Sequence, residues 1–494
     1  VTTEQATPRT RSRPLEVLIV GAGFGGIAAA LELRRHGITE IKLLEAAPQV
    51  GGTWFYNSYP GAACDVPSHL YSYSFAQRRD WSRLCSPQAE ILNYLQAVAR
   101  TSGVAPLVQT SCRVRRCQFD ETRSRWMVST EGGETHEADV IILATGQLNR
   151  PSIPPLPGRE LFAGHSFHSS RWDHDYALAG KRVAVVGTGA SAVQFVPHVA
   201  RQAAELTVFQ RTANWMLPRR NRVYSPLVRR LIERLPWIQA IRRRWLFYYC
   251  ESLTLAIRHP RTLGRAFGLG AKAFMHSQLP DAALRAKAMP DYAFGCKRVL
   301  FSSHYLPALA LPNVELVTEP IAAVTERGIK TEDGQERGFD CIIWSTGFRA
   351  SEFVAPMGVV GAGGKELSDV WRNGAHAHLG LTVPGFPSLF LMYGPNTNTS
   401  GGSIIFYLEA QAAYIRQALE HLRTGRFARV EVLAEVEAES DRATQERFAG
   451  TAWTGCDSWY LDGQGRNVAN WPGYMREYLA ATRAFDPAEY SFTG

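Results

Sequence analysis

A mainly apolar run ends in closely spaced glycines at Leu15-Glu-Val-Leu-Ile-Val-Gly-Ala-Gly-Phe-Gly-Gly26. Such a short run is typical of a buried parallel strand. An Ala- and Leu-rich helical pattern follows to about His36, and a second strand is expected at 41–45. Gly21, Gly23 and Gly26 fit the pattern G-x-G-x-x-G between strand and helix. The sequence therefore predicts a βαβ unit whose helix N-terminus can bind phosphate.

A dinucleotide is the ligand that this unit predicts. Glu45 stands 19 residues after Gly26, where an acid that accepts hydrogen bonds from ribose hydroxyls is expected. Gly52, Thr53 and Trp54 continue the chain directly after the second strand. The alternatives are a tight turn without a ligand and, at Gly52, a glycine-rich turn beside a packed Trp.

A second unit of the same kind begins at Lys181. A strand at 183–186 runs into G-x-G-x-x-A, and a helix to about Gln202 and a strand at 206–210 follow. The residues of this second fingerprint that we expect to contact a cofactor are Gly187, Gly189, Ser191 and Ala192. Two fingerprints in one chain imply two dinucleotides, and we interpret them as a tightly held FAD and an exchanging nicotinamide.

The second unit lacks the acid that an NAD site would have. Arg211 stands 19 residues after Ala192, and Thr212 follows it. A carboxylate there would repel a 2′-phosphate, whereas a guanidinium can bind it with two hydrogen bonds. This difference favours NADPH over NADH, and the alternative is a surface arginine without a ligand.

Composition narrows the class of protein. The chain has 494 residues, 45% hydrophobic content and 20% charged content, as expected of a globular protein with more than one domain. No nucleic-acid motif accompanies the formal charge of +9, so we expect no nucleic-acid partner. The eight cysteines include no C-x-x-C pair, which disfavours a redox dithiol and a zinc site and suits unpaired thiols in a reducing cytoplasm.

Three segments differ in character from the two units. Residues 1–13 are polar, lack the apolar core of a signal peptide and are expected to form a loose tail. Pro-rich residues 151–157 predict a stiff linker. Residues 221–290 mix arginines with aromatics at helical spacing and predict a helical insertion. That insertion could rest on a membrane surface, or it could be an ordinary helical subdomain, and no segment predicts a membrane span.

The linker region carries a further pattern, F-x-G-x-x-x-H-x-x-x-W-D, formed by Phe162, Gly164, His168, Trp172 and Asp173. Together with the two flanking fingerprints, this pattern resembles the signature of type I Baeyer–Villiger monooxygenases. Ordinary flavin-containing monooxygenases carry a Tyr at the Trp-Asp position. The resemblance covers the chain from about Leu15 to Tyr474.

The fold that pattern and resemblance together imply is α/β, with two Rossmann-like domains for FAD and NADP and a helical insertion. The FAD-binding domain is expected at 14–150 and, by the resemblance, is completed by 380–494, which ends in a mobile segment. The linker and NADP-binding domain are expected at 151–220 and 291–379, separated by the helical subdomain at 221–290.

Several site residues follow from the resemblance alone. It places Gly52, Thr53, Trp54 and Asp65 near the flavin, Lys297 near the NADP phosphate, and Arg298 at the active site as the essential cation. It assigns His168 to domain coupling, and it assigns the substrate lid to Trp459. A plain structural ion pair is the alternative for Asp65 and Arg298.

The activity that the resemblance implies is NADPH- and O2-dependent conversion of a ketone to an ester or lactone through a flavin C4a-peroxide. The alternatives are a sulfur or nitrogen oxygenase of the same fold and a non-catalytic flavin-binding protein. We expect FAD and NADPH as cofactors, no metal, a cytoplasmic location and no stable membrane insertion. The sequence determines neither the ketone nor the oligomeric state.

Overall fold

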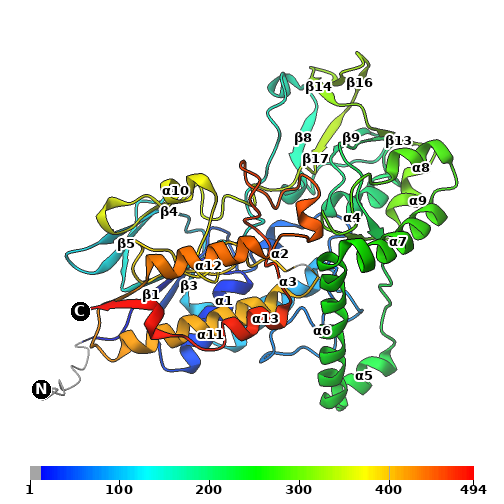
Figure 1. Cartoon of the computed structure of the whole chain (residues 1–494). Helices are drawn as coiled ribbons and strands as arrows, with labels where there is room; N and C mark the ends of the chain where they lie inside the picture. Colours follow the sequence, from blue (N-terminus) through cyan, green and yellow to red (C-terminus); the bar gives the residue numbers. More distant parts are fainter. Residues whose placement is uncertain (1–12, 400) are drawn as a thin grey trace, which may run out of the picture.

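The computed structural model describes residues 13–399 and 401–494 and has two lobes (Figure 1). The first lobe contains both the N-terminal strands and the C-terminal helices, and the second contains the middle of the chain. Of the predicted loose tail at 1–13, residues 1–12 lie outside the described residues. The prediction is wrong for Arg13, because its guanidinium donates to Asp139 at 2.9 Å.

The first lobe is built on a five-stranded parallel sheet in the order β19-β7-β1-β2-β3, with bounds Leu389–Leu391, Val140–Leu143, Val17–Val20, Ile41–Leu44 and Val108–Gln109. Helix α1 (Phe24–Arg35) follows β1 and packs against α11 (Ile404–Arg423). Residues almost 400 positions apart therefore share one core, in which Ile27, Leu408 and Ile415 are buried.

The second lobe repeats the arrangement with the order β13-β10-β9-β17-β8, with bounds Val314–Val317, Glu205–Phe209, Arg182–Val186, Cys341–Trp344 and His165–His168. All of its strand pairs are parallel. Helix α4 (Ala190–Val199) follows β9 as α1 follows β1. The two parallel sheets confirm the predicted α/β class.

Antiparallel strands extend both lobes. In the first lobe, an antiparallel meander is formed by β4 (Val114–Asp120), β5 (Arg125–Thr130) and β6 (Thr135–Ala138). Strand β18 (Gly358–Val360) pairs with β4 at the edge of this meander. In the second lobe, β14, β15 and β16 form a small sheet at Ile321–Val324, Gly328–Thr331 and Glu336–Gly338.

The predicted insertion is helical. It contains α5, α6, α7 and α8, with bounds Pro226–Arg234, Pro236–Arg258, Arg265–Gln278 and Ala282–Ala288. Helix α6 packs through Leu246 and Cys250 against Tyr407, Met475 and Tyr478. Helix α6 therefore contacts the first lobe, although the chain enters it from the second. Across the described residues, no helix is both long and apolar enough to cross a membrane.

Candidate functional site

The turn between β1 and α1 has room only for glycine. Gly21 has a φ of +104°, and a Cβ on it would lie 2.5 Å from the carbonyl oxygen of Ala144. A Cβ on Gly26 would lie 1.9 Å from the carbonyl oxygen of Gly21. These contacts bring the start of helix α1 close to β1, so that its unpaired N–H groups point to the carboxyl edge of the sheet.

A cleft of about 520 Å³ opens at this edge, a size typical of ligand sites. The predicted residues that line it are Gly21, Gly23, Glu45, Gly52, Thr53 and Trp54. The Glu45 carboxylate accepts from the backbone N–H of Ala22 at 2.7 Å and of Ala47 at 2.8 Å. Burial raises the pKa of Glu45, although these hydrogen bonds oppose the shift. The carboxylate thus supports the glycine turn at the wall of the cleft.

The second fingerprint reproduces the first. A Cβ on Gly187 would lie 2.4 Å from the carbonyl oxygen of Ser345, as at Gly21. Ala192 replaces the third glycine and is fully buried. No atom lies within 4 Å of a Cβ built on Gly189, so this side of the turn is open. The phosphate-binding geometry that the sequence predicts is therefore present twice.

Arg211 and Thr212 follow β10 beside this turn. The carbonyl oxygen of Thr212 accepts from the hydroxyl of Thr188 at 3.2 Å, and Asn214 donates to the carbonyl of Thr188 at 2.8 Å. Arg211 is exposed, and within the described part of the chain it has no carboxylate partner. Burial and the positive charge of Arg211 lower the pKa of Lys297, so the two cations are neighbours. The sequence alone did not indicate that Asn214 would support this turn.

Asp65 and Arg298 form an ion pair across the two lobes. A guanidinium nitrogen of Arg298 donates to the Asp65 carboxylate at 2.6 Å. Burial would raise the pKa of Asp65, but the charges of Arg298 and Arg219 outweigh it and lower that pKa below its usual range. Asp65 in turn raises the pKa of Arg298. The Arg298 side chain is 43% exposed, so it can contact a ligand while Asp65 holds it.

Residues that the sequence did not single out complete this region. Tyr393 lines the first cleft. Burial raises the pKa values of Tyr393 and Tyr460, and the positive charge of Arg298 opposes both shifts, so both rings lie near Arg298. The side chain of Gln194 on α4 donates to the carbonyl of Ala63 at 3.0 Å and accepts from its N–H at 3.1 Å. Gln194 thus ties the Asp65 segment to the second fingerprint. No spacing along the chain could have indicated these contacts.

The linker signature begins before β8, at Phe162 and Gly164, and continues through β8 into the turn after it. Trp172 packs against Phe167 and Phe195, with ring centroids 5.2 and 5.1 Å apart, and Asp173 lies 2.9 Å from His165. A Cβ on Gly164 would lie 2.5 Å from the Phe162 ring. The signature therefore packs β8 onto the second lobe and does not line the first cleft.

His168 lies where the linker contacts the turn after β17. Its Nδ1 accepts from the N–H of Ser170 at 3.1 Å, so Nε2 carries the proton and donates to the carbonyl of Gly347 at 3.0 Å. The same carbonyl accepts from the N–H of Ser152 in the linker at 2.9 Å. Burial lowers the pKa of His168 from 6.5 to about 4, which keeps the ring neutral.

We expect this lowered pKa to make stability depend on pH. The unfolded chain takes up a proton below pH 6.5 and folded His168 only below about 4, so its contribution is complete above pH 6.5 and is lost as pH falls towards 4. In urea unfolding, wild type should lose about 1–2 kcal/mol more than His168→Gln between pH 7 and pH 5. Exposed His276→Gln is the control. Equal losses in wild type and His168→Gln would contradict the assignment.

The C-terminal segment is joined to the Arg298 segment by a disulfide. Cys296 and Cys456 are bonded, so the expectation of unpaired thiols is wrong for these two cysteines, while the other six are free and buried. The partners lie 160 residues apart and become neighbours only in the fold. Trp459, the predicted lid residue, is half-exposed and packs on Tyr460 at 4.3 Å between ring centroids. The neighbouring Tyr460 lies near enough to Arg298 for each to shift the pKa of the other.

Opening this disulfide should destabilise the protein. Because the bond closes a long loop, Cys456→Ser should lower the free energy of unfolding by about 2–4 kcal/mol and increase protease cleavage after residue 456. Cys296→Ser should have the same effect, and a reductant should destabilise wild type but neither variant. Wild type that is insensitive to reductant would show that the bond contributes nothing.

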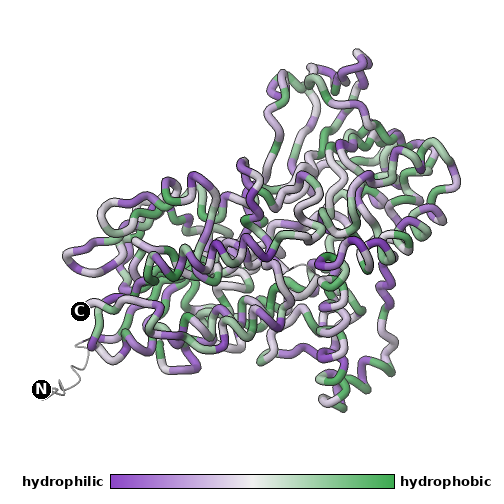
Figure 2. The backbone as a smooth tube through the Cα atoms, viewed as in Figure 1, coloured by the Kyte–Doolittle hydropathy of each residue, from purple (hydrophilic) through white to green (hydrophobic). Residues whose placement is uncertain are grey.

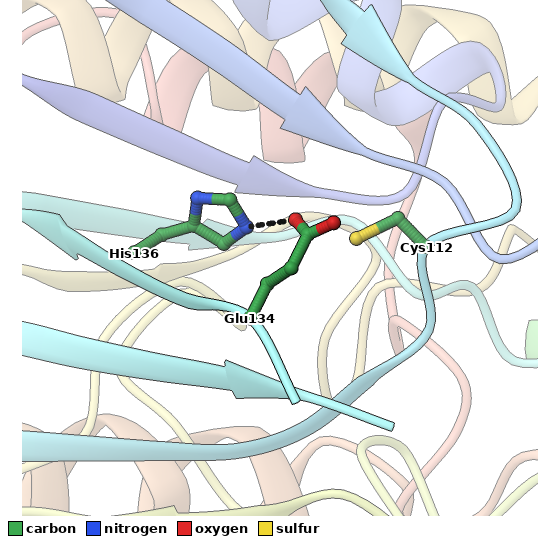
Figure 3. A group of neighbouring side chains, drawn as sticks. All are labelled: Cys112, Glu134 and His136. Carbon is green, nitrogen blue, oxygen red and sulfur yellow. Dashed lines mark ion pairs between the residues drawn. The ribbon is translucent and has the colours of Figure 1, made fainter. Parts of the chain in front are cut away.

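One cluster has donor atoms of the kind that bind metals. The side chains of Cys112, Glu134 and His136 approach within 4.8 Å of one another (Figure 3). The ammonium of Lys42 lies 3.3 Å from Nδ1 of His136, where it repels a cation. Burial and Glu134 raise the pKa of Cys112, which keeps its thiol protonated. Burial and the charge of Lys42 also lower the pKa of His136, so we interpret the cluster as a polar network and assign it no metal.

Two dinucleotide-binding turns, one in each lobe, and an ion-paired cation that joins the lobes define a flavin- and nicotinamide-dependent oxidoreductase. The family of pyridine nucleotide-disulphide oxidoreductases matches residues 18–242. A Baeyer–Villiger monooxygenase of Streptomyces coelicolor is 44% identical over 96% of this chain and 92% of its own length. The chain belongs to the Baeyer–Villiger monooxygenase family.

Solved structures agree with this assignment. A structure of the OTEMO complex with FAD and NADP has a TM-score of 0.88 at 26% identity and covers 98% of this chain and 100% of its own. Cyclohexanone monooxygenase from Rhodococcus sp. Phi1 bound to NADP+ has a TM-score of 0.87 at 26% identity, with the same coverage. The predicted family, the Rossmann-like fold, the monooxygenase class and the cofactors FAD and NADPH are confirmed.

Proposed function

We propose that this chain inserts one atom of O2 next to the carbonyl carbon of a ketone and produces an ester or lactone. The other oxygen atom leaves as water, so NADPH, a proton, O2 and the ketone balance NADP+, water and the ester. The observation that carries the proposal is the Asp65–Arg298 ion pair at 2.6 Å, because it holds a permanent cation beside Tyr393 of the first cleft.

The two fingerprints divide the cofactors between the lobes. FAD, when bound, supplies the activation of O2, and the residues that would hold it are Gly21, Gly23, Gly26, Glu45, Gly52, Thr53, Trp54 and Asp65. The residues that would hold NADPH are Gly187, Gly189, Ser191, Ala192, Arg211, Thr212 and Lys297. The glycine contacts, the open side of Gly189 and the paired cations Arg211 and Lys297 support these roles.

Arg298 and Asp65 are the catalytic residues of the proposal. Negative charge develops on the substrate oxygen when the carbonyl carbon is attacked, and a fixed guanidinium stabilises it without reorganisation. Asp65 orients the guanidinium and raises its pKa, so Arg298 remains a cation and does not serve as an acid. Tyr460, which is buried, and Tyr393, which is partly buried, limit the access of water to the pair.

The remaining signature residues would transmit the position of one lobe to the other. His168 is assigned to this coupling because it shares the Gly347 carbonyl with the linker. Trp459 is assigned to a lid over the substrate. We further propose the domain limits 14–150 with 380–494 for FAD, 151–220 with 291–379 for NADP, and 221–290 for the helical subdomain. A cytoplasmic location is proposed because six of the eight cysteines are unpaired, although the Cys296–Cys456 disulfide would have to persist in a reducing compartment.

The test follows oxygen into product. The FAD-loaded protein is reduced anaerobically with NADPH and mixed with O2 and a panel of cyclic, linear and steroid-like ketones, with a thioether and a tertiary amine in parallel. Mass spectrometry should find one oxygen from ¹⁸O2 in an ester or lactone. Oxygen found only in a sulfoxide or N-oxide would replace the proposal with heteroatom oxygenation. Release of all oxidising equivalents as hydrogen peroxide would refute both.

A further inference from the structure

Exposed apolar side chains concentrate on the helical insertion. Of the 14 large hydrophobic residues that are exposed in the described chain, nine lie between Val223 and Tyr249. Figure 1 shows α5 and the adjoining end of α6 projecting beyond both sheets, and Figure 2 shows hydrophobic residues at this end. Single exposed apolar residues need no explanation, but a contiguous group marks an interaction surface.

Helix α6 presents an outward apolar stripe formed by Trp237, Ile241, Trp245, Tyr248 and Tyr249. Their spacing of about four residues places them on one helix face. Trp237 is 60% exposed and Trp245 63%, and the Trp245 and Tyr249 rings stack with centroids 5.6 Å apart. On α5, which contacts α6, Leu227 and Leu231 add exposed aliphatic surface.

The opposite face of α6 is anchored to the first lobe. Arg243 donates to the carbonyls of His69 and Ser72 at 2.8 and 3.0 Å and lies 4.5 Å from the Phe406 ring. Gln239 donates to the side chain of Gln77 at 2.8 Å. The stripe is therefore held outward by a packed helix, and its exposure does not result from a missing contact on the inner face.

Arginines surround the apolar surface. From Arg219 to Arg244 the sequence contains nine arginines and one acid, Glu233. Arg230, Arg234 and Arg244 are exposed, and none has a carboxylate partner among the residues that the structure describes. The surface thus combines aromatic and aliphatic side chains with unpaired cations, the combination that binds a helix in the interfacial plane of an anionic bilayer.

We propose that α5 and α6 dock this protein on the surface of an anionic lipid bilayer. Trp237, Ile241, Trp245, Leu227 and Leu231 would enter the boundary between headgroups and acyl chains, and the arginines would bind lipid phosphates. Charge favours this occupant over a second copy, because a two-fold interface would bring the same arginines together. The aliphatic residues favour it over single-stranded nucleic acid, whose bases stack on aromatic rings.

The experiment measures partitioning of the FAD-loaded full chain onto sedimented vesicles. Vesicles of phosphatidylcholine alone are compared with vesicles in which phosphatidylglycerol replaces part of it. Wild type should bind the anionic vesicles and should be released as salt is raised, because screening weakens the arginine contacts. Trp237→Ser with Trp245→Ser should lower the partition coefficient at least about tenfold.

Matched variants distinguish binding through this surface from nonspecific adsorption to the vesicles. Leu227→Ser in the surface should weaken binding several-fold, whereas Leu269→Ser on α7, which is 69% exposed against 77% for Leu227, should not. Arg230→Gln with Arg244→Gln should weaken binding, and exposed Arg201→Gln should not. Unchanged FAD content and melting temperature would show that each variant folds.

Three outcomes would overturn the proposal. Absence of binding to anionic vesicles at low salt would exclude a lipid surface. A dimer in sedimentation velocity that Trp237→Ser with Trp245→Ser dissociates would identify a second copy as the occupant. Tighter binding to single-stranded DNA than to vesicles, unaffected by Leu227→Ser, would identify a nucleic acid.

Discussion

Arg298→Ala should lower ester or lactone formation by about a hundred- to a thousandfold, because loss of one fixed group that stabilises a developing oxyanion costs about that much. FAD should remain bound, and NADPH should still reduce it, since neither step needs a cation at the substrate carbonyl. Arg298→Lys should restore little, because an ammonium cannot reproduce the planar guanidinium that Asp65 orients. Product mass spectrometry and NADPH consumption, measured together, separate the two half-reactions.

A surface ion pair of the same type is the control for Arg298. Arg182 lies 3.1 Å from Asp340 at the start of β9, the end of the strand opposite the second fingerprint turn, and Arg182→Ala removes an arginine–aspartate pair at the surface. This variant should form product at the wild-type rate, because exposed pairs contribute little. Near wild-type ester formation by Arg298→Ala would place the essential cation elsewhere, and Lys297→Ala would then be the next variant to measure.

The two glycine fingerprints could be predicted from the sequence because the backbone geometry of a strand–turn–helix segment determines which positions need glycine. Gly21 and Gly187 each face a carbonyl oxygen at the end of a neighbouring strand, and a strand–turn–helix pattern demands glycine there in any such fold. The position of Glu45 follows from the same geometry. Gly26 and Glu45 are fixed by Gly21 and Ala22 of the same βαβ unit, and the turn itself requires a positive φ at Gly21 and Gly187, which leaves a spacing that can be read along the chain.

The rest of the site depends on contacts between distant segments. Cys296 and Cys456 bond across 160 residues, and Gln194 binds Ala63 across 131. Tyr460 reaches Arg298 only because the C-terminal segment returns to the lobe interface. No periodicity or motif encodes such pairings. Asp65 and Arg298 themselves could be named from family resemblance, but their 2.6 Å contact required the fold.

Arg211→Ala should raise the KM for NADPH about ten- to a hundredfold and leave the KM for NADH almost unchanged. A hydrogen bond between a guanidinium and a phosphate contributes about 1.5–3 kcal/mol, which corresponds to this range. The structure supports the site because Arg211 has no carboxylate partner within the described residues and lies near enough to Lys297 to lower its pKa. Two neighbouring cations beside an open glycine turn suit a dianion.

Arg211→Lys distinguishes charge from geometry, because an ammonium keeps the charge and loses the two-point contact. It should recover part of the NADPH affinity. Exposed Arg201→Ala in the same lobe should change neither KM, which controls for net charge. Calorimetric titration with NADP+ and NAD+ removes the ambiguity of KM, since it reports binding alone. If NADP+ and NAD+ lost equal affinity, Arg211 would contact a group that both nucleotides carry. Lys297 would then bind the 2′-phosphate without help from Arg211.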